Sequence, residues 1–331
     1  ALTSVSLDSL STVGDALYIY SNDVLHSVSL ESLSTIAGPT YINDNNALTS
    51  ASLDSLSTIG FDFYIYNNDA LESLSLESLS TIGDTLYIHD NATLTPLSLD
   101  GLTDIGGSLD VEDNAALTSL SLDGLTDIGG DLHIYYNNTL TSVSLNSLST
   151  IGGSLTLYDN AALNSASLNS LTSIDSFLEI AYNDALTSVS LSTLSTIGRD
   201  LYIYSNHALH SVALDSLALV DGGVFIWELV ALTSLSLDGL TDIGEYLHIE
   251  SNAALTSVAF NSLTTVGSNL TIYDNDALTW FELFNLTTVM GEINITENDA
   301  LCQSLADAFV DAMTALGWSD RLVSFDNDDS C

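Results

Sequence analysis

The chain has 331 residues, with 44 acidic residues against 2 basic ones, and its formal net charge at pH 7 is −42. Such a charge excludes nucleic acid as a partner, because proteins hold the phosphate backbone with Lys and Arg. No segment offers the roughly 18 consecutive apolar residues that a membrane-spanning helix needs.

Residues 1–299 consist of one sequence unit repeated thirteen times, every 23 residues, without an insertion or a deletion. The first copy is ALTSVSLDSLSTVGDALYIYSND and the last is ALTWFELFNLTTVMGEINITEND. A fixed period of this length is typical of a solenoid, in which each copy forms one coil and stacks on the next. The sequence therefore predicts two regions, the repeats at 1–299 and a C-terminal segment at 300–331. Positions within a copy are numbered from 1 to 23, with Ala1 at position 1.

The apolar positions of the repeat predict its strands. Positions 2 and 10 are Leu in all thirteen copies, and positions 5, 7, 13, 17 and 19 are nearly always apolar. Apolar and polar residues alternate at positions 5–7 and 17–20, as in half-buried strands, and more weakly at 10–13. No stretch before residue 300 has the periodicity of a helix. The predicted fold is thus all-β, a parallel β-solenoid of thirteen leucine-rich coils of 23 residues.

Position 14 is Gly in nine of the thirteen copies. Glycine reaches φ angles above zero without strain, and Asp tolerates them better than most residues. Since Asp175 and Asp221 also stand at this position, we expect position 14 to form a corner of the coil with positive φ.

Position 22 is Asn in every copy except the one that carries Leu229. A stacked column of Asn side chains can satisfy its own amides and the backbone of the neighbouring turns. We therefore interpret this column as structural and not as a ligand site. Its members are Asn22, Asn45, Asn68, Asn91, Asn114, Asn137, Asn160, Asn183, Asn206, Asn252, Asn275 and Asn298.

Aromatic residues gather at positions 18 and 20, on the side of the predicted strand that faces solvent. So long a stripe exceeds the scattered exposed aromatics of most monomers, although tyrosine also favours strands for its own sake. We interpret the stripe as a face that binds a surface glycan or a second copy of the chain. Its candidate residues are Tyr18, Tyr20, Tyr41, Tyr64, Tyr66, Tyr87, Tyr202 and Tyr204.

Two further outward columns carry hydroxyl and carboxylate groups. Serine occupies position 4 in eleven copies and position 6 in ten, and a flat hydroxyl array gives ice binding as an alternative function. Acidic residues recur at position 8, as in Asp100, and at position 21, as in Asp113. Columns of like charge repel unless salt screens them or a cation bridges them. We interpret them as a solvated acidic face, with Ca²⁺ sites as the alternative and no metal ligand identified.

The sequence contains no motif of an active site. It has neither a G-x-S-x-G elbow nor a phosphate-binding loop, so we expect no enzyme and no certain cofactor. The histidines fall in scattered columns, and we expect them to lack the partner carboxylate that a base or a metal site needs. They are His26, His89, His133, His207, His210 and His248.

The segment after residue 299 predicts a cap. CQSLADAFVDAMTALGW has the spacing of an amphipathic helix that ends at Gly317 and covers the open end of the core. A disulfide between Cys302 and Cys331 would close a loop of about 30 residues and stabilise the cap by roughly 3–4 kcal/mol. Such a pair favours an oxidising, extracellular compartment, with two reduced cysteines as the alternative. The apolar helix positions are Leu305, Phe309, Val310, Met313 and Leu316.

The pattern xLTSLSLxSLTxIGGxLxIxxN, followed by N-D-A-L-C at Asn298 to Cys302 and a distant final Cys, resembles the receptor L domain. That family includes the ligand-binding lobes of growth-factor and insulin receptor ectodomains and relatives in other surface proteins. The resemblance covers essentially the whole chain and implies a right-handed, leucine-rich β-solenoid outside the cell. No ligand-contacting residue of the receptors matches a motif here, so none is transferred.

Together these features predict a non-enzymatic extracellular or cell-surface scaffold, structural or adhesive, that associates with itself or with a surface glycan through its tyrosine face. An ice-binding protein that uses the Ser/Thr face is one alternative. A ligand-binding receptor ectodomain is the other.

Overall fold

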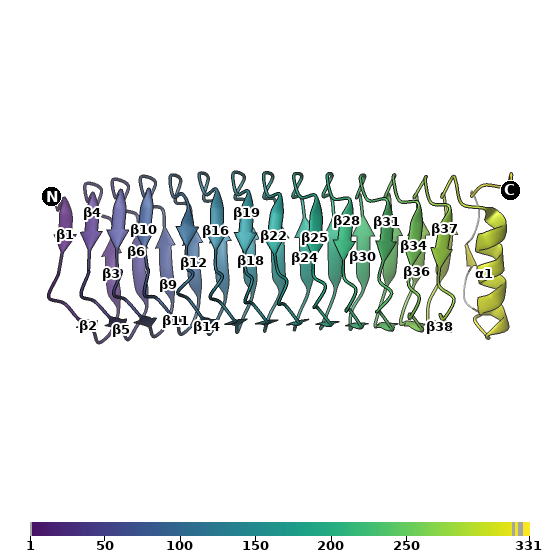
Figure 1. The fold of residues 1–331 in the computed structure, drawn as a ribbon, viewed down its shortest axis with the longest axis horizontal. Coiled ribbons are helices and arrows are strands. Elements are labelled where there is room, and N and C mark those ends of the chain that lie inside the picture. The colour runs from purple at the N-terminus through teal and green to yellow at the C-terminus, as the bar shows by residue number, and fades with distance from the viewer. Residues whose placement is uncertain (1, 320–321, 324–326) are drawn as a thin grey trace. The chain divides into compact units, whose positions relative to one another are not determined.

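The structure, a computed structural model, describes residues 2–319, 322–323 and 327–331 (Figure 1). The chain folds as a parallel β-solenoid with three short strands in each 23-residue coil, thirteen coils in all, as the repeat predicts. By its internal contacts it divides into two compact units, Ala1–Leu171 and Thr172–Cys331.

In the first unit the strands form three parallel columns, in which each residue pairs with the residue 23 positions further on. The first column contains β1 (Ser4–Ser6), β4 (Ser27–Ser29), β7 (Ser50–Ser52), β10 (Ser73–Ser75), β13 (Leu97–Ser98), β16 (Ser119–Ser121), β19 (Ser142–Ser144) and β22 (Ser165–Ser167). The second contains β2 (Thr12–Val13), β5 (Thr35–Ile36), β8 (Thr58–Ile59), β11 (Thr81–Ile82), β14 (Asp104–Ile105), β17 (Asp127–Ile128) and β20 (Thr150–Ile151). The third contains β3 (Leu17–Tyr20), β6 (Thr40–Asn43), β9 (Phe63–Tyr66), β12 (Leu86–His89), β15 (Leu109–Glu112), β18 (Leu132–Tyr135) and β21 (Leu155–Tyr158).

The second unit repeats these columns. Its first column contains β25 (Ser188–Ser190), β28 (Ser211–Ala213), β31 (Ser234–Ser236), β34 (Ser257–Ala259) and β37 (Trp280–Glu282). The second contains β23 (Ser173–Ile174), β26 (Thr196–Ile197), β29 (Leu219–Val220), β32 (Asp242–Ile243), β35 (Thr265–Val266) and β38 (Thr288–Val289). The third contains β24 (Leu178–Ala181), β27 (Leu201–Tyr204), β30 (Val224–Trp227), β33 (Leu247–Glu250), β36 (Leu270–Tyr273) and β39 (Ile293–Thr296), and β40 (Leu322–Val323) pairs with β39.

The leucines of positions 2 and 10 form the core of both units. From Leu25 and Leu33 onward they are buried in every coil. The first strand of a coil spans positions 4–6, one residue earlier than the alternation predicts. It ends there because position 7 begins a turn, in which the N–H of position 10 donates to its carbonyl, as Leu33 does to Leu30 at 3.0 Å.

The prediction of positive φ at position 14 is wrong. Position 21 has that conformation in every coil, with φ between 50° and 58°, and Asp113 is one example. Glycine at position 14 instead allows successive coils to approach each other closely. A Cβ on Gly129 would lie 2.1 Å from the carbonyl oxygen of Gly106, whereas one on Gly14, in the first coil, would meet nothing within 4 Å.

A proline interrupts the first column of the first unit. The column forms two sheets, one from β1 to β10 and one from β13 to β22, and Pro96 stands at position 4 of the coil that starts the second sheet. Proline has no N–H to donate to the preceding strand, so the pairing ends at β10.

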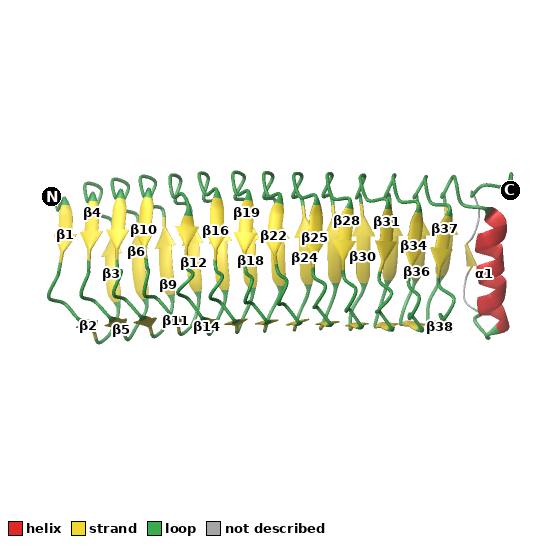
Figure 2. Cartoon of the chain, in the orientation of Figure 1, coloured by secondary structure: helices red, strands yellow, loops and turns green. Residues whose placement is uncertain are grey.

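The predicted cap is present. Helix α1 (Gln303–Ala315) follows the last coil, as Figure 2 shows in red, and Gly317 ends it with φ 100°. The disulfide Cys302–Cys331 joins the start of the helix to the end of the chain. Val310 and Met313 are buried as predicted, but Leu316 is 58% exposed, because it follows the last helical turn. No helix among the described residues is long and apolar enough to cross a membrane.

Candidate binding surface

The third column presents aromatic side chains to solvent. Its inward residues, at positions 17 and 19, fill the core, and its outward residues stand at positions 18 and 20. In the first unit the outward positions of β3, β6, β9 and β12 carry no carboxylate. We name these eight residues the first aromatic patch: Tyr18, Tyr20, Tyr41, Asn43, Tyr64, Tyr66, Tyr87 and His89.

Five of the seven rings of the first aromatic patch stack along the column, whereas Tyr20 and Tyr87 make edge-to-face contacts with Tyr18 and Tyr64. Tyr18 and Tyr41 lie with centroids 5.0 Å apart and planes 12° from parallel, and Tyr41 and Tyr64 lie 4.8 Å apart at 10°. Tyr66 stacks on His89 at 4.8 Å in the same way. A ring that is stacked on both faces, as Tyr41 is, turns mainly its edge and its hydroxyl group to solvent. Tyr18 and Tyr20, at its beginning, are the most exposed, at 57% and 58%.

Carboxylates end the first aromatic patch. The next strand, β15, places Asp110 and Glu112 at the two outward positions. The hydroxyl of Tyr87 donates to Glu112 Oε2 at 3.1 Å. The pKa of Tyr87 is raised to about 12, mainly by burial and secondly by this hydrogen bond to Glu112. The phenol is therefore neutral at physiological pH. The patch is therefore an uncharged area with an acidic border.

A smaller group lies in the second unit, on β27 and β30. Tyr202 stacks on Phe225 at 5.0 Å and Tyr204 on Trp227 at 3.9 Å, and we name these four residues the second aromatic patch. Carboxylates border it too: the Tyr204 hydroxyl donates to Glu179 on β24 at 2.7 Å, and β33 carries Glu250 opposite Trp227.

The eight tyrosines expected in one stripe thus fall into two groups, six in the first aromatic patch and two in the second. The expected stripe is not continuous along the first unit, because Asp110 and Glu112 take the outward positions of β15, directly after the first aromatic patch. Sequence reasoning missed that His89 belongs to the first group, since a lone histidine gives no aromatic signal. Its place at position 20, directly after Tyr66, was the available clue.

The Asn column lies beneath the turn that follows the third strand. Asn114 is fully buried, and its Nδ2 donates to the carbonyls of Ile88 and Glu112 at 2.9 and 2.8 Å. Its Oδ1 accepts from the backbone and side-chain nitrogens of Asn91, both at 3.2 Å. Corresponding bonds recur along the column in the first unit from Asn45 to Asn160, and Asn22, in the first coil, donates to Tyr20 and Asn45. In the second unit Asn183 donates to Asn206, and Asn252, Asn275 and Asn298 continue the column to Asn327.

Many hydroxyl groups of the Ser/Thr face already have acceptors within the chain. Ser121 donates to Asp100 and Ser144 to Asp123, each on the preceding coil. The hydrogen bond from Ser121 is the largest influence on the pKa of Asp100, and it lowers that pKa. At position 3, Thr141 donates to the carbonyl of Thr118 at 2.9 Å. These bonds couple neighbouring coils.

The expectation that the histidines lack partner carboxylates is wrong for four of them. The pairs are His89 with Asp90, His133 with Asp110, His207 with Asp184 and His248 with Glu250. Two of the partners lie on the preceding coil, 23 residues away, so spacing along the sequence hides them. Within the described part of the chain no three His, Cys, Asp or Glu side chains gather closely enough to hold a metal ion, so no particular Ca²⁺ site emerges from the acidic columns.

Comparison with protein-family models finds no match for the chain, and comparison with curated proteins finds none either. Among solved structures, the chain is similar to a leucine-rich repeat protein from Bacteroides ovatus ATCC 8483. The two are 14% identical, with a TM-score of 0.48, over 95% of this chain and 87% of that one. This likeness assigns no function, and the resemblance to the receptor L domain stays a prediction.

Proposed function

We propose that this protein is a non-enzymatic scaffold outside the cell that associates with copies of itself through the first aromatic patch. One observation carries the proposal: in a chain with a net charge of −42, eight neighbouring positions that point away from the core hold six tyrosines, one His and one Asn, which is buried, and no carboxylate. Two such chains repel each other over most of their surfaces. An uncharged patch is where close contact costs least, and tyrosine is enriched at protein interfaces.

The stacking favours a second copy of the chain over a glycan as the partner. Sugars bind tyrosine by lying flat on an exposed ring face, but Tyr41 lies between Tyr18 and Tyr64 at about stacking distance on both sides. Ring edges and hydroxyl groups remain, and these suit edge-to-face contacts with aromatic side chains of another copy. Ice binding has less support, because many Ser and Thr hydroxyl groups donate within the chain.

The disulfide supports the extracellular part of the proposal. Disulfides persist in oxidising compartments and are rare in the cytosol. Cys302–Cys331 is of the structural kind, since it ties the end of the chain to the start of a helix. We further propose that 1–299 act as the scaffold and 300–331 as its cap.

Sedimentation velocity over a series of protein concentrations tests the association. In about 0.5 M NaCl, where the Debye length is about 4 Å, the protein should form dimers or larger species that dissociate on dilution. Tyr20→Ser with Tyr66→Ser should weaken this association at least tenfold. Tyr135→Ser with Tyr158→Ser changes the same repeat position outside the patch and should leave it unaltered. A monomer at every concentration and salt, or equal effects of the two variants, would reject the proposal.

A further inference from the structure

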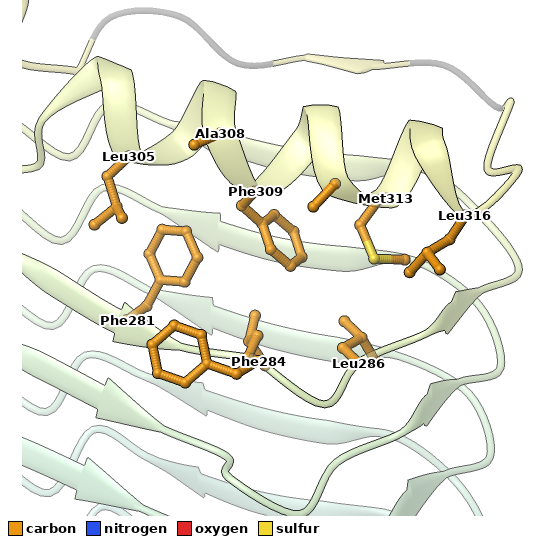
Figure 3. A pocket seen from close by; sticks show the side chains of 10 residues that line it. Phe281, Phe284, Leu286, Leu305, Ala308, Phe309, Met313 and Leu316 are labelled. Atoms are coloured by element: carbon orange, nitrogen blue, oxygen red, sulfur yellow. The ribbon is translucent and has the colours of Figure 1, made fainter.

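A second apolar surface lies at the other end of the sequence, between the last coil and the cap helix. Phe281, Phe284 and Leu286 come from the coil, Phe309 and Met313 come from α1, and Leu316 follows the helix directly. Figure 3 shows Phe281 and Leu286 on the coil pointing toward Phe309 and Met313 on the helix. The cleft between the coil and the helix has a volume of about 270 Å³. We name it the C-terminal cleft.

The C-terminal cleft has a closed floor and an open rim. Phe281 and Met313 are buried, and Phe281 packs edge-to-face on Phe309 with centroids 5.5 Å apart. Phe284 and Leu316 stand at the rim, 70% and 58% exposed. Such exposure of large apolar side chains beside a preformed cleft is typical of a surface that another apolar group covers.

The charged side chains of the described segments that build the C-terminal cleft are all negative, and this favours a positively charged occupant. Residues 277–319, which build the last coil and the helix, contain six acidic residues and no Lys or Arg. The acidic residues are Glu282, Glu292, Glu297, Asp299, Asp307 and Asp311. An anionic membrane surface or an acidic ligand would be repelled. A ligand with apolar groups and positive charges could place its apolar groups in the cleft and would also be attracted by the acidic residues.

A second copy of this chain does not have that chemistry. The chain has only two basic residues, Arg199 and Arg321. Arg199 lies among Asp200, Asp221 and Glu245, so its surroundings are acidic. The cleft therefore fits a different molecule from the partner of the first aromatic patch.

From the cleft geometry and this charge distribution, we infer that the C-terminal cleft binds a basic amphipathic segment of another protein, with apolar side chains in the cleft and Lys or Arg beside the acidic residues. A helix with apolar residues at i, i+3, i+4 and i+7 presents such a row, and grooves lined by Phe, Leu and Met accommodate varied sequences of this kind.

Titration calorimetry with model peptides tests the inference on the full chain. The probe is a Leu/Lys amphipathic helix of about 18 residues, or five turns. It should bind at physiological salt with a negative heat-capacity change, which marks apolar burial. A Lys/Ser peptide of equal charge and a Leu/Glu peptide of equal apolar content should each bind at least tenfold more weakly. Equal binding by the Lys/Ser peptide would reduce the interaction to net charge and overturn the inference, and equal binding by the Leu/Glu peptide would remove its electrostatic basis.

A matched pair of variants locates the site. Phe284→Ser with Leu316→Ser removes two exposed rim side chains and should weaken the Leu/Lys peptide at least tenfold. Phe61→Ser with Val230→Ser removes two side chains that are 55% and 46% exposed elsewhere, and should leave binding within twofold. Unchanged affinity in the rim variant, or an equal loss in both, would overturn the inference. Because neither variant touches the first aromatic patch, self-association should persist in both, which separates this result from a failure of the proposed function.

Discussion

The side-chain amide of Asn91 donates to Oδ1 of Asn114 at 3.2 Å, and the two residues stand at the same position of successive coils. Asn114 in turn donates to the carbonyl of Ile88 on the preceding coil and to Asn137 on the next. One buried side chain thus links three coils. The side chains of the Asn column form the hydrogen bonds that water would otherwise form with the backbone groups of the turn. These backbone groups can therefore be buried and still have hydrogen-bond partners.

Replacing Asn114 should therefore be costly. Asn114→Leu keeps the volume but removes the side-chain hydrogen bonds to the carbonyls of Ile88 and Glu112, and it leaves the N–H of Asn91 without its acceptor. A lost hydrogen bond costs about 1 kcal/mol and a buried unpaired N–H about 1–3 kcal/mol, so we expect a loss of about 3 kcal/mol and a lower midpoint of urea unfolding. Asn146→Leu, at an exposed position, should cost below about 1 kcal/mol. Similar midpoints for the two variants would contradict this account of the column.

Glycine at position 14 should matter only where a preceding coil is present. Gly129→Ala places a Cβ 2.1 Å from the Gly106 carbonyl, so the coils must separate, and we expect a loss of about 1–3 kcal/mol, as for overpacking of a core. Gly14→Ala has open space and should change stability by less than about 0.5 kcal/mol. Thermal unfolding of the two variants checks the difference. A larger effect at Gly14 would refute the steric explanation.

The fold was readable from the sequence because each core position recurs thirteen times, so single exceptions such as Thr40 do not obscure the pattern. The prediction for position 14 was wrong because glycine can be favoured for its lack of a side chain, where coils approach closely, as well as for positive φ. The pairing of His133 with Asp110 became visible only once residues 23 apart were placed side by side. The C-terminal cleft could not be predicted, because it depends on how α1 lies against Phe281 and Leu286, and the repeat says nothing about that contact.

Hydroxyl donors should make particular carboxylates more acidic. The hydroxyl of Thr150 donates to Asp127, and this bond, the largest influence, lowers the pKa of Asp127. A lowered folded-state pKa contributes stability that is present above the unfolded value and is lost as pH falls through the folded value. Thr150→Val should therefore raise the pKa of Asp127 in an NMR titration and reduce stability above pH 4 more than at pH 2.

The control for that titration is Thr288→Val, at the same repeat position, where the preceding coil carries Thr265 and no carboxylate. It should leave the pKa of Asp127 unchanged. An unchanged pKa of Asp127 in the Thr150→Val protein would show that the hydrogen bond from Thr150 does not lower that pKa.

The disulfide should stabilise the cap. Native protein without reductant should show no free thiol, and Cys331→Ser should lower the melting temperature, since the bond closes a loop with a sequence separation of 29. For a loop of that length the expected loss is roughly 3–4 kcal/mol. Two titratable thiols in unreduced protein would contradict both the bond and the compartment inferred from it.

The central claim, that the first aromatic patch joins copies of the chain because it is uncharged, is tested most directly by adding one charge to it. Tyr41→Asp does so at repeat position 18, where Asp110 shows that a coil accepts this residue. Thr271→Asp adds the same charge at the same repeat position on β36, outside both patches. In sedimentation equilibrium at high salt, we predict that Tyr41→Asp is monomeric while Thr271→Asp associates like the unaltered protein. Association of the Tyr41→Asp protein at unaltered strength would contradict the claim.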